Sequence, residues 1–137
     1  MITKGVVETR KIAQELAKKS KGRIFALVGE LGAGKTTFVQ AFLKALGVKG
    51  RVMSPTFVIM RNYQLKDGRK VYHLDGYRIK EDKELVSLGF KDLIKDPNNI
   101  ILIEWADRVK KLLPPETIWL EFEHGKNSKE RIIKIKK

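Results

Sequence analysis

A run of glycines followed by a lysine and two threonines has the composition and spacing of a phosphate-binding loop. The run reads Gly29-Glu30-Leu31-Gly32-Ala33-Gly34-Lys35-Thr36-Thr37 and matches the pattern G-x-x-x-x-G-K-[ST] at every fixed position. Glycines let a backbone wrap closely around an anion, and the N–H groups that open the following helix point toward it. Lys35 would place a positive charge on the terminal phosphates of a nucleotide, and Thr36 would offer its hydroxyl to Mg²⁺.

The segments on either side of this loop have the patterns that such a loop requires. Residues 24–28 form an unbroken apolar run, which is typical of a strand buried on both faces. After the loop, apolar residues recur one, three and four positions apart, as on one face of a helix, and Gly47 is a suitable helix end. Motif and context together predict a phosphate site rather than a glycine-rich turn that binds nothing.

Two carboxylates stand at the ends of other predicted strands. Residues 100–103 are apolar, and Glu104 follows them directly, in the form of a Walker B strand. A carboxylate at this edge can hold Mg²⁺ and orient an attacking water, with a structural role as the alternative. Asp75 ends the strand predicted over residues 70–74, where it could serve a metal or a water, or simply cap a turn.

Other polar residues give weaker signals. Thr56 lies in the segment Ser54-Pro55-Thr56-Phe57, which the proline stiffens. A threonine in such a loop reaches the terminal phosphate or its metal in nucleotide-switch proteins, but the spacing alone favours an ordinary turn into a strand. His73 stands alone and is expected to be structural, and His124 carries no functional signal.

The remaining patterns complete an α/β chain. We expect an edge strand over residues 1–6, a helix over 8–19, a possible short strand over 51–53, and one or two short helices over 81–94 broken near Gly89. Strands over 56–65 and 70–74 would form a β-hairpin with a turn at 66–69, and strands over 117–124 and 131–135 would form a second, after a short helix over 106–113. With the buried strands 24–28 and 100–103 in the interior, the expected fold is a three-layer α/β/α P-loop NTPase fold with a mostly parallel central sheet, built as a single domain over residues 1–137.

Composition narrows the partners and the compartment. Lys and Arg total 29 against 16 acidic residues, a net charge of +13, which suits either a nucleic-acid partner or a lysine-rich solvated surface. The chain has no cysteine, which excludes disulfides and thiolate metal sites. No apolar run approaches the roughly 20 residues of a membrane span, and the first residues do not resemble a signal peptide, so we expect a cytoplasmic protein.

Four blocks in order resemble the TsaE family, also called YjeE. They are the phosphate loop 29–37, the segment 54–57, His73-Leu74-Asp75-Gly76-Tyr77-Arg78, and Ile103-Glu104-Trp105. The phosphate loop alone is shared by many families, whereas the four blocks together are far more specific. The resemblance covers essentially the whole chain and implies a small P-loop ATPase required for the threonylcarbamoyl modification of the adenosine beside the anticodon of certain tRNAs.

The resemblance also implies roles for individual residues. Residues Gly32, Ala33, Gly34, Lys35, Thr36 and Thr37 would hold the phosphates of ATP. Thr36 and Glu104 would hold Mg²⁺, Thr56 would belong to a switch-like loop, and Asp75 would be essential for turnover. Thr9 aligns with a family threonine close to the nucleotide. The proteins TsaB and TsaD would be the partners.

Two positions depart from the family pattern. Gly76 stands where a bulky apolar residue is usual, which suggests a more mobile loop after Asp75, and Ala106 replaces a frequent proline. Neither change removes a residue named as a ligand.

Other functions compatible with a phosphate loop remain open. A small metabolite kinase would need an arginine-rich lid, and residues 81–94 contain no arginine. A binding module could use ATP only to set its shape, without turnover. A GTPase is disfavoured because the guanine signature N-K-x-D is absent. Arg51, Arg61 and Arg78 lie between the phosphate loop and Glu104, but no motif identifies any of them as an arginine finger.

Overall fold

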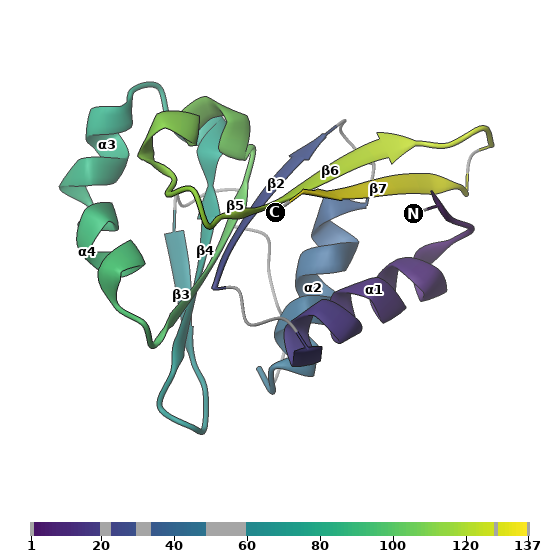
Figure 1. Cartoon of the computed structure of the whole chain (residues 1–137), viewed down its shortest axis with the longest axis horizontal. Helices are drawn as coiled ribbons and strands as arrows, with labels where there is room; N and C mark the ends of the chain where they lie inside the picture. Colours follow the sequence, from purple (N-terminus) through teal and green to yellow (C-terminus); the bar gives the residue numbers. More distant parts are fainter. Residues whose placement is uncertain (1, 20–22, 30–33, 49–59, 128, 137) are drawn as a thin grey trace.

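One twisted sheet runs through the molecule, and helices lie on both of its faces (Figure 1). The computed structural model describes residues 2–19, 23–29, 34–48, 60–127 and 129–136. Within these ranges the sheet has seven strands in the order β1-β7-β6-β2-β5-β4-β3. The strands are β1 (Ile2–Thr3), β2 (Ile24–Gly29), β3 (Met60–Gln64), β4 (Lys70–Asp75), β5 (Asn99–Glu104), β6 (Ile118–His124) and β7 (Arg131–Lys136).

The four central strands are parallel, and the outer strands are antiparallel to their neighbours. β2 pairs in parallel with β5 and β6, and β5 also pairs in parallel with β4. The β3–β4 and β6–β7 hairpins add the antiparallel margins, and β1 pairs with β7 at one edge. This confirms the predicted three-layer fold, including the interior positions of β2 and β5. Both strands are continuous apolar runs because helices cover each face of a parallel sheet.

Each face of the sheet has its own apolar core. The helices α1 (Val6–Lys19) and α2 (Lys35–Ala45) pack on one face, and α3 (Asp82–Ser87) and α4 (Phe90–Lys95) pack on the other with the 3₁₀ segment η2 (Ala106–Leu112). Side chains alternate between the faces along a strand. Thus Phe25 and Leu27 of β2 join the core under α2, whereas Ile24 and Ala26 join the core under α4.

The predicted end of the phosphate-loop helix is confirmed in detail. Leu46 caps α2, and Gly47 follows with a φ of 96°. The Gly47 N–H donates to the Lys44 carbonyl at 3.0 Å, and the Val48 N–H donates to the Leu43 carbonyl at 3.0 Å. These two bonds make a Schellman motif, which needs a residue that tolerates positive φ.

Three local expectations have different outcomes in the structure. The break between α3 and α4 does fall at Gly89, whose φ is 83°. The helix expected over residues 106–113 is instead the 3₁₀ segment η2, which is kinked at Val109. Of the strand expected over 56–65, the described part begins at Met60, and residues 51–53 lie outside the described ranges.

None of the described helices has the length and apolar character that a membrane span requires.

The packing of α2 on the sheet generates a stability prediction. Phe42 is 1% exposed, and its ring centroid lies 4.9 Å from that of Phe25 in an edge-on contact. Phe42→Ala should lower the free energy of unfolding by about 3–5 kcal/mol in urea denaturation, because it leaves a cavity between helix and sheet. The control Val7→Ala, at a residue 65% exposed, should stay within about 0.5 kcal/mol of the native protein. Equal losses for the two variants would contradict this packing.

Candidate active site

The two described ends of the phosphate loop are shaped for close backbone approach. Gly29 ends β2 with a φ of 143°, and a Cβ there would lie 2.1 Å from the Phe122 carbonyl oxygen on β6. Gly34 precedes α2 with a φ of 103°, and no side chain caps the helix at this position. The first turn of α2 contains no acidic residue, so its N–H groups and positive dipole end can face an anion.

Lys35 is held inside the protein at the start of α2. Its side chain is 5% exposed, and its Nζ donates to the Gly29 carbonyl at 2.8 Å and lies 3.7 Å from the centroid of the Trp105 ring. Burial lowers the pKa of this ammonium, and that effect exceeds the opposing pull of three nearby carboxylates, those of Glu104, Asp107 and Asp75. The contact with the indole face partly compensates the cation for lost water.

Trp105 turns the chain sharply at the end of β5. Its φ of 57° is left-handed, which is unusual for a bulky residue and places its ring beside Lys35. The Tyr77 ring lies 5.2 Å from the Trp105 ring, and the Arg108 guanidinium lies 5.1 Å from the Tyr77 centroid. Aromatic and cationic groups therefore form the border of the site next to β4 and β5.

Gly76 packs tightly rather than opening a gap. It starts the 3₁₀ segment η1 (Gly76–Arg78), is buried, and a Cβ on it would lie 2.6 Å from the Trp105 carbonyl oxygen. The structure shows a short helical turn here, seated against the backbone of residues 104–105, and the more mobile loop stays a prediction. The missing side chain permits this approach.

Glu104 and Asp75 lie side by side where β5 and β4 end. The parallel register pairs these two residues directly, and it pairs Leu27 of β2 with Glu104 on the other side. Alternation along the strands puts both carboxylates on the face covered by α2, the face to which Leu102 and Val71 contribute. β5 thus separates Asp75 from the phosphate-loop strand, so Asp75 lies one strand further from the loop than Glu104 does.

Asp75 also has a local structural task. Its Oδ1 accepts a hydrogen bond from the Tyr77 N–H at 3.0 Å, and so caps η1. The capping alternative is therefore observed, and it leaves the half-buried carboxylate at the same edge of the sheet as Glu104.

His73 does not stand alone, contrary to the expectation from sequence. Its Nε2 lies 2.6 Å from the Glu104 Oε2, and the two side chains are 2% and 8% exposed. Two residues before Asp75 on the same strand, His73 shares its face of the sheet. The H-x-D spacing could have predicted that His73 and Asp75 lie on the same face of one strand.

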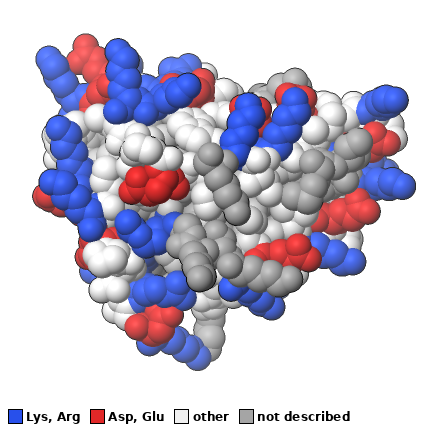
Figure 2. Space-filling view, in the orientation of Figure 1, with Lys and Arg blue, Asp and Glu red and all other residues white. Residues whose placement is uncertain are grey.

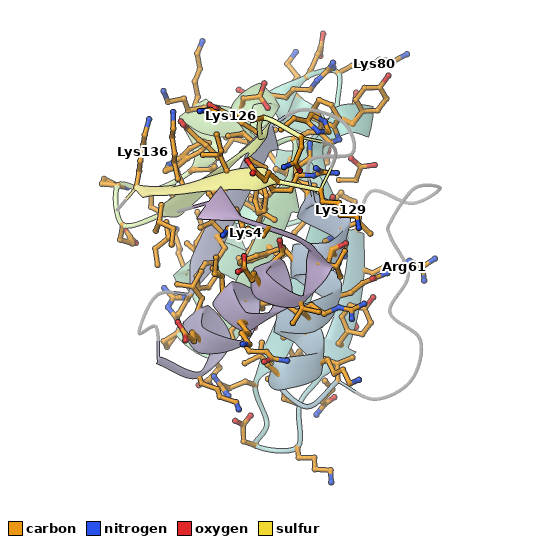
Figure 3. The ribbon with its side chains drawn as sticks, turned by 90° about the vertical axis from the view of Figure 1, so that its right-hand side faces the viewer. Lys4, Arg61, Lys80, Lys126, Lys129 and Lys136 are labelled. Atoms are coloured by element: carbon orange, nitrogen blue, oxygen red, sulfur yellow. The ribbon has the colours of Figure 1, made fainter. Side chains whose placement is uncertain are left out.

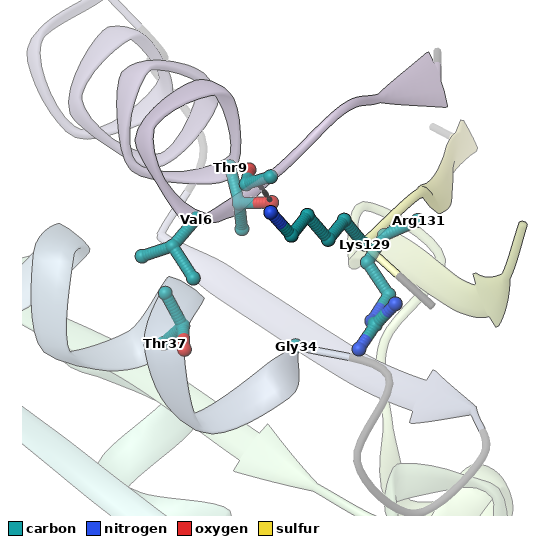
Figure 4. Close-up of a pocket in the computed structure, with 7 residues that line it drawn as sticks. Val6, Thr9, Gly34, Thr37, Lys129 and Arg131 are labelled. Carbon is teal, nitrogen blue, oxygen red and sulfur yellow. Dashed lines mark hydrogen bonds between the residues drawn. The ribbon is translucent and has the colours of Figure 1, made fainter. Parts of the chain in front are cut away.

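A hollow of about 400 Å³ opens on the other side of the loop (Figure 4). It is lined by Gly5, Val6, Thr9, Gly34, Thr37, Lys129 and Arg131. Thr9 is 2% exposed, and its hydroxyl donates to the Gly5 carbonyl at 3.3 Å. In Figure 4 the Lys129 side chain extends toward Thr9, and the Arg131 guanidinium points toward Gly34. Cavities of this size hold small organic ligands.

Arg131 lines this hollow beside Gly34, a position that the sequence did not predict. Its Cγ lies 3.9 Å from the position a Cβ would take on Gly34, although 97 residues (131 − 34) separate the two in the chain. Of the arginines considered from sequence, Arg61 lies on β3, at the opposite edge of the sheet from β7, and Arg51 lies outside the described ranges. No local motif could have identified Arg131, because only the β6–β7 hairpin brings it to the loop.

The remaining site predictions have mixed outcomes. Thr36 is exposed in the first turn of α2, and Thr37 is half-buried and faces the hollow. Gly32, Ala33 and Thr56 lie outside the described ranges. Among the residues that the structure describes, no group of three or more His, Cys, Asp or Glu side chains is placed to hold a metal ion.

Comparison with known proteins gives one consistent family. A family model described as threonylcarbamoyl adenosine biosynthesis protein TsaE matches residues 3–133. A protein of Aquifex aeolicus is 38% identical over 128 residues, which cover 91% of this chain and 86% of the relative. One of Bacillus subtilis is 35% identical over 127 residues, covering 91% and 77%. Both relatives are named tRNA threonylcarbamoyladenosine biosynthesis protein TsaE.

A solved structure agrees with these sequence matches. The crystal structure of YdiB from Bacillus subtilis superposes with a TM-score of 0.73 at 31% identity, covering 97% of this chain and 80% of that one. The likeness therefore extends over the sheet, both helical layers and the segments that carry the site. On these matches, the chain belongs to the TsaE family.

Proposed function

We propose that this chain, as a single domain over residues 1–137, is the ATP-binding, Mg²⁺-dependent ATPase component of the machinery that makes N6-threonylcarbamoyladenosine in tRNA. Membership of the TsaE family supports the pathway. The observation that carries the ATPase proposal is the convergence of Lys35, Glu104 and Trp105 beside an uncapped helix N-terminus. This arrangement combines a phosphate cradle with a carboxylate one strand away.

The site has two sides, which suggests how ATP lies in it. The phosphates would contact the N–H groups at the start of α2. The terminal phosphate would lie toward the side of β5, near Lys35 and Glu104. The nucleoside would occupy the hollow on the β7 side, which begins at Gly34 and Thr37. Thr9, Lys129 and Arg131 would then be its neighbours, and the two cations would also face the phosphates.

The donors present fit a magnesium ion that is bound together with the nucleotide. Mg²⁺ usually takes one or two protein carboxylates and completes its shell with waters and substrate phosphates. The exposed Thr36 hydroxyl and the Glu104 carboxylate supply such a partial set, and no larger cluster is needed. When bound, Mg²⁺ neutralises charge that develops on the β- and γ-phosphate oxygens.

The chain's own residues would then divide the work. Lys35 would exchange the Gly29 carbonyl for phosphate oxygens, whose negative charge better stabilises its buried ammonium. Glu104 and Asp75 would orient the attacking water from the edge of the sheet. Thr56, by resemblance, would belong to a loop that responds to the terminal phosphate.

Partners would complete or order this site. We propose TsaB and TsaD as these partners, together with direct tRNA contact through basic side chains. On the face in Figure 2, Lys and Arg are interspersed with Asp and Glu, and Lys134 and Lys136 pair with Glu123 and Glu121. Lys4, Lys126 and Lys129 lie around the β6–β7 hairpin in Figure 3, which makes this region the candidate for a polyanion.

The proposed function is tested by steady-state phosphate release at saturating ATP. The lone chain should hydrolyse ATP slowly, and addition of TsaB and TsaD should accelerate it, by about 10³-fold or more if a partner supplies an arginine finger. Lys35→Ala should abolish turnover but keep its unliganded thermal transition, because the native ammonium is buried at a cost. Rapid turnover by the lone chain, or no response to the partners, would contradict the proposal.

Variants of Glu104 and Asp75 should differ in how strongly their nucleotide binding and turnover depend on Mg²⁺. Glu104→Gln should lose Mg²⁺-dependent hydrolysis yet still bind nucleotide, because the change keeps the shape and removes the charge. Asp75→Asn should also block turnover, with a smaller change in the Mg²⁺ concentration needed for half-maximal binding. Calorimetric titration of nucleotide with and without Mg²⁺ measures both. Full partner-stimulated activity in both variants would show that these roles are wrong.

Indole emission should report nucleotide binding through Trp105. ATP with Mg²⁺ should alter the emission, because phosphate draws the Lys35 ammonium away from the Trp105 ring that it now contacts at 3.7 Å. Trp105→Phe should remove most of the change, and Trp119→Phe, in β6, should retain it. The reverse result would place the nucleotide nearer the C-terminal hairpin.

A further inference from the structure

A buried hydrogen bond ties β4 to the carboxylate at the end of β5. The His73 Nε2 and the Glu104 Oε2 are 2.6 Å apart, with both side chains almost fully buried. An ionised carboxylate only accepts hydrogen bonds, so with Glu104 ionised the proton between the two atoms belongs to Nε2. A charge-assisted bond of this kind is among the stronger polar contacts in a protein.

The sheet register explains why this hydrogen bond holds the Glu104 side chain in one orientation. His73 pairs with Leu102, so Glu104 is its diagonal neighbour two residues further along β5 on the same face. Asp75 stands directly opposite Glu104, and two like charges at paired positions repel one another. A donor that approaches Glu104 from residue 73 offsets this repulsion and fixes a side chain that would otherwise rotate.

We propose that His73 is a positioning residue that orients Glu104 toward Mg²⁺ and the terminal phosphates without touching either. The bond uses one acceptor site of Oε2, so Oε1 would be the oxygen that stays available to the ion. The inference rests on the proposed role of Glu104 as a magnesium ligand. It assigns to His73 the part that outer-shell partners play in metal sites, where their loss typically costs about 10–100-fold in metal affinity or activity.

A purely structural histidine would satisfy the same burial but would have no effect on the ion. A metal titration therefore distinguishes the positioning role of His73 from a purely structural one, whereas a stability measurement does not. His73→Leu removes the donor at similar bulk, and His73→Gln keeps an amide N–H at the ε position. Val71→Ala is the matched control, because Val71 is fully buried in the apolar core, two residues earlier on the same strand and face.

The measurement is the Mg²⁺ concentration that gives half-maximal thermal stabilisation of the chain by ADP, with the ADP affinity in EDTA as reference. His73→Leu should raise this Mg²⁺ concentration by about 10–100-fold and leave the EDTA affinity within about twofold. His73→Gln should recover most of the loss, and Val71→Ala should lower the melting temperature with no change in the Mg²⁺ requirement. A His73→Leu protein with the native Mg²⁺ requirement would overturn the inference.

Glu104→Gln separates failure of this inference from failure of the proposed function. If Glu104→Gln keeps the native Mg²⁺ requirement, Glu104 is no ligand and the proposed function fails with it. If Glu104→Gln loses Mg²⁺ dependence and His73→Leu does not, only the role of His73 is wrong. In the double variant, His73→Leu should add no further loss, because it acts through Glu104.

The tautomer of His73 gives a test that requires neither metal nor mutation. The chain has two histidines, and His124 is exposed, so their ¹⁵N imidazole signals are readily told apart. Nitrogen-15 correlation spectra at neutral pH should show a proton on Nε2 of His73. A neutral ring protonated on Nδ1 alone could not donate to Glu104 and would overturn the inference even if a variant fails to fold.

Discussion

The parallel pairing of β2 with β5 is the constraint on which the site depends. It sets Leu27 opposite Glu104, and so places the last residues before the phosphate loop beside the carboxylate that ends the neighbouring strand. Both strands can occupy the centre because they are apolar on both faces, and helices remove each face from water. The described ends of the predicted phosphate loop and the carboxylate therefore meet at the carboxyl edge of the sheet, where ligands of open α/β folds bind.

Two charged side chains are buried at this edge of the sheet. Lys35 leaves water for the Gly29 carbonyl and the Trp105 ring, and its pKa falls as a result. Glu104 is buried as well and has His73 as its hydrogen-bond partner. A buried cation such as Lys35 costs stability in the unliganded protein and attracts an incoming anion more strongly than it would in water. A buried carboxylate such as Glu104 does the same for an incoming cation.

Much of the fold and part of the site could be predicted because local patterns carry the necessary information. The apolar run before Gly29, the helical period after Lys35 and the turn residues at Gly68 and Gly89 are each properties of a few consecutive residues. Such patterns depend on side-chain periodicity and on allowed φ angles, which act over short stretches of chain. The η2 segment was harder to predict, because the left-handed Trp105 before it is not apparent from residue type.

The sequence by itself determined the motif of the predicted phosphate loop, the two strands that end in carboxylates and the family resemblance, because each depends on contiguous residues. Only the tertiary structure decided which distant groups meet. The register of β4 and β5 brings His73 within hydrogen-bond distance of Glu104. The Lys35 ammonium contacts the face of the Trp105 ring, and the β6–β7 hairpin brings Arg131 beside Gly34. Strand order and register arise from packing of the whole sheet between its two helical layers, so no local spacing can specify these contacts.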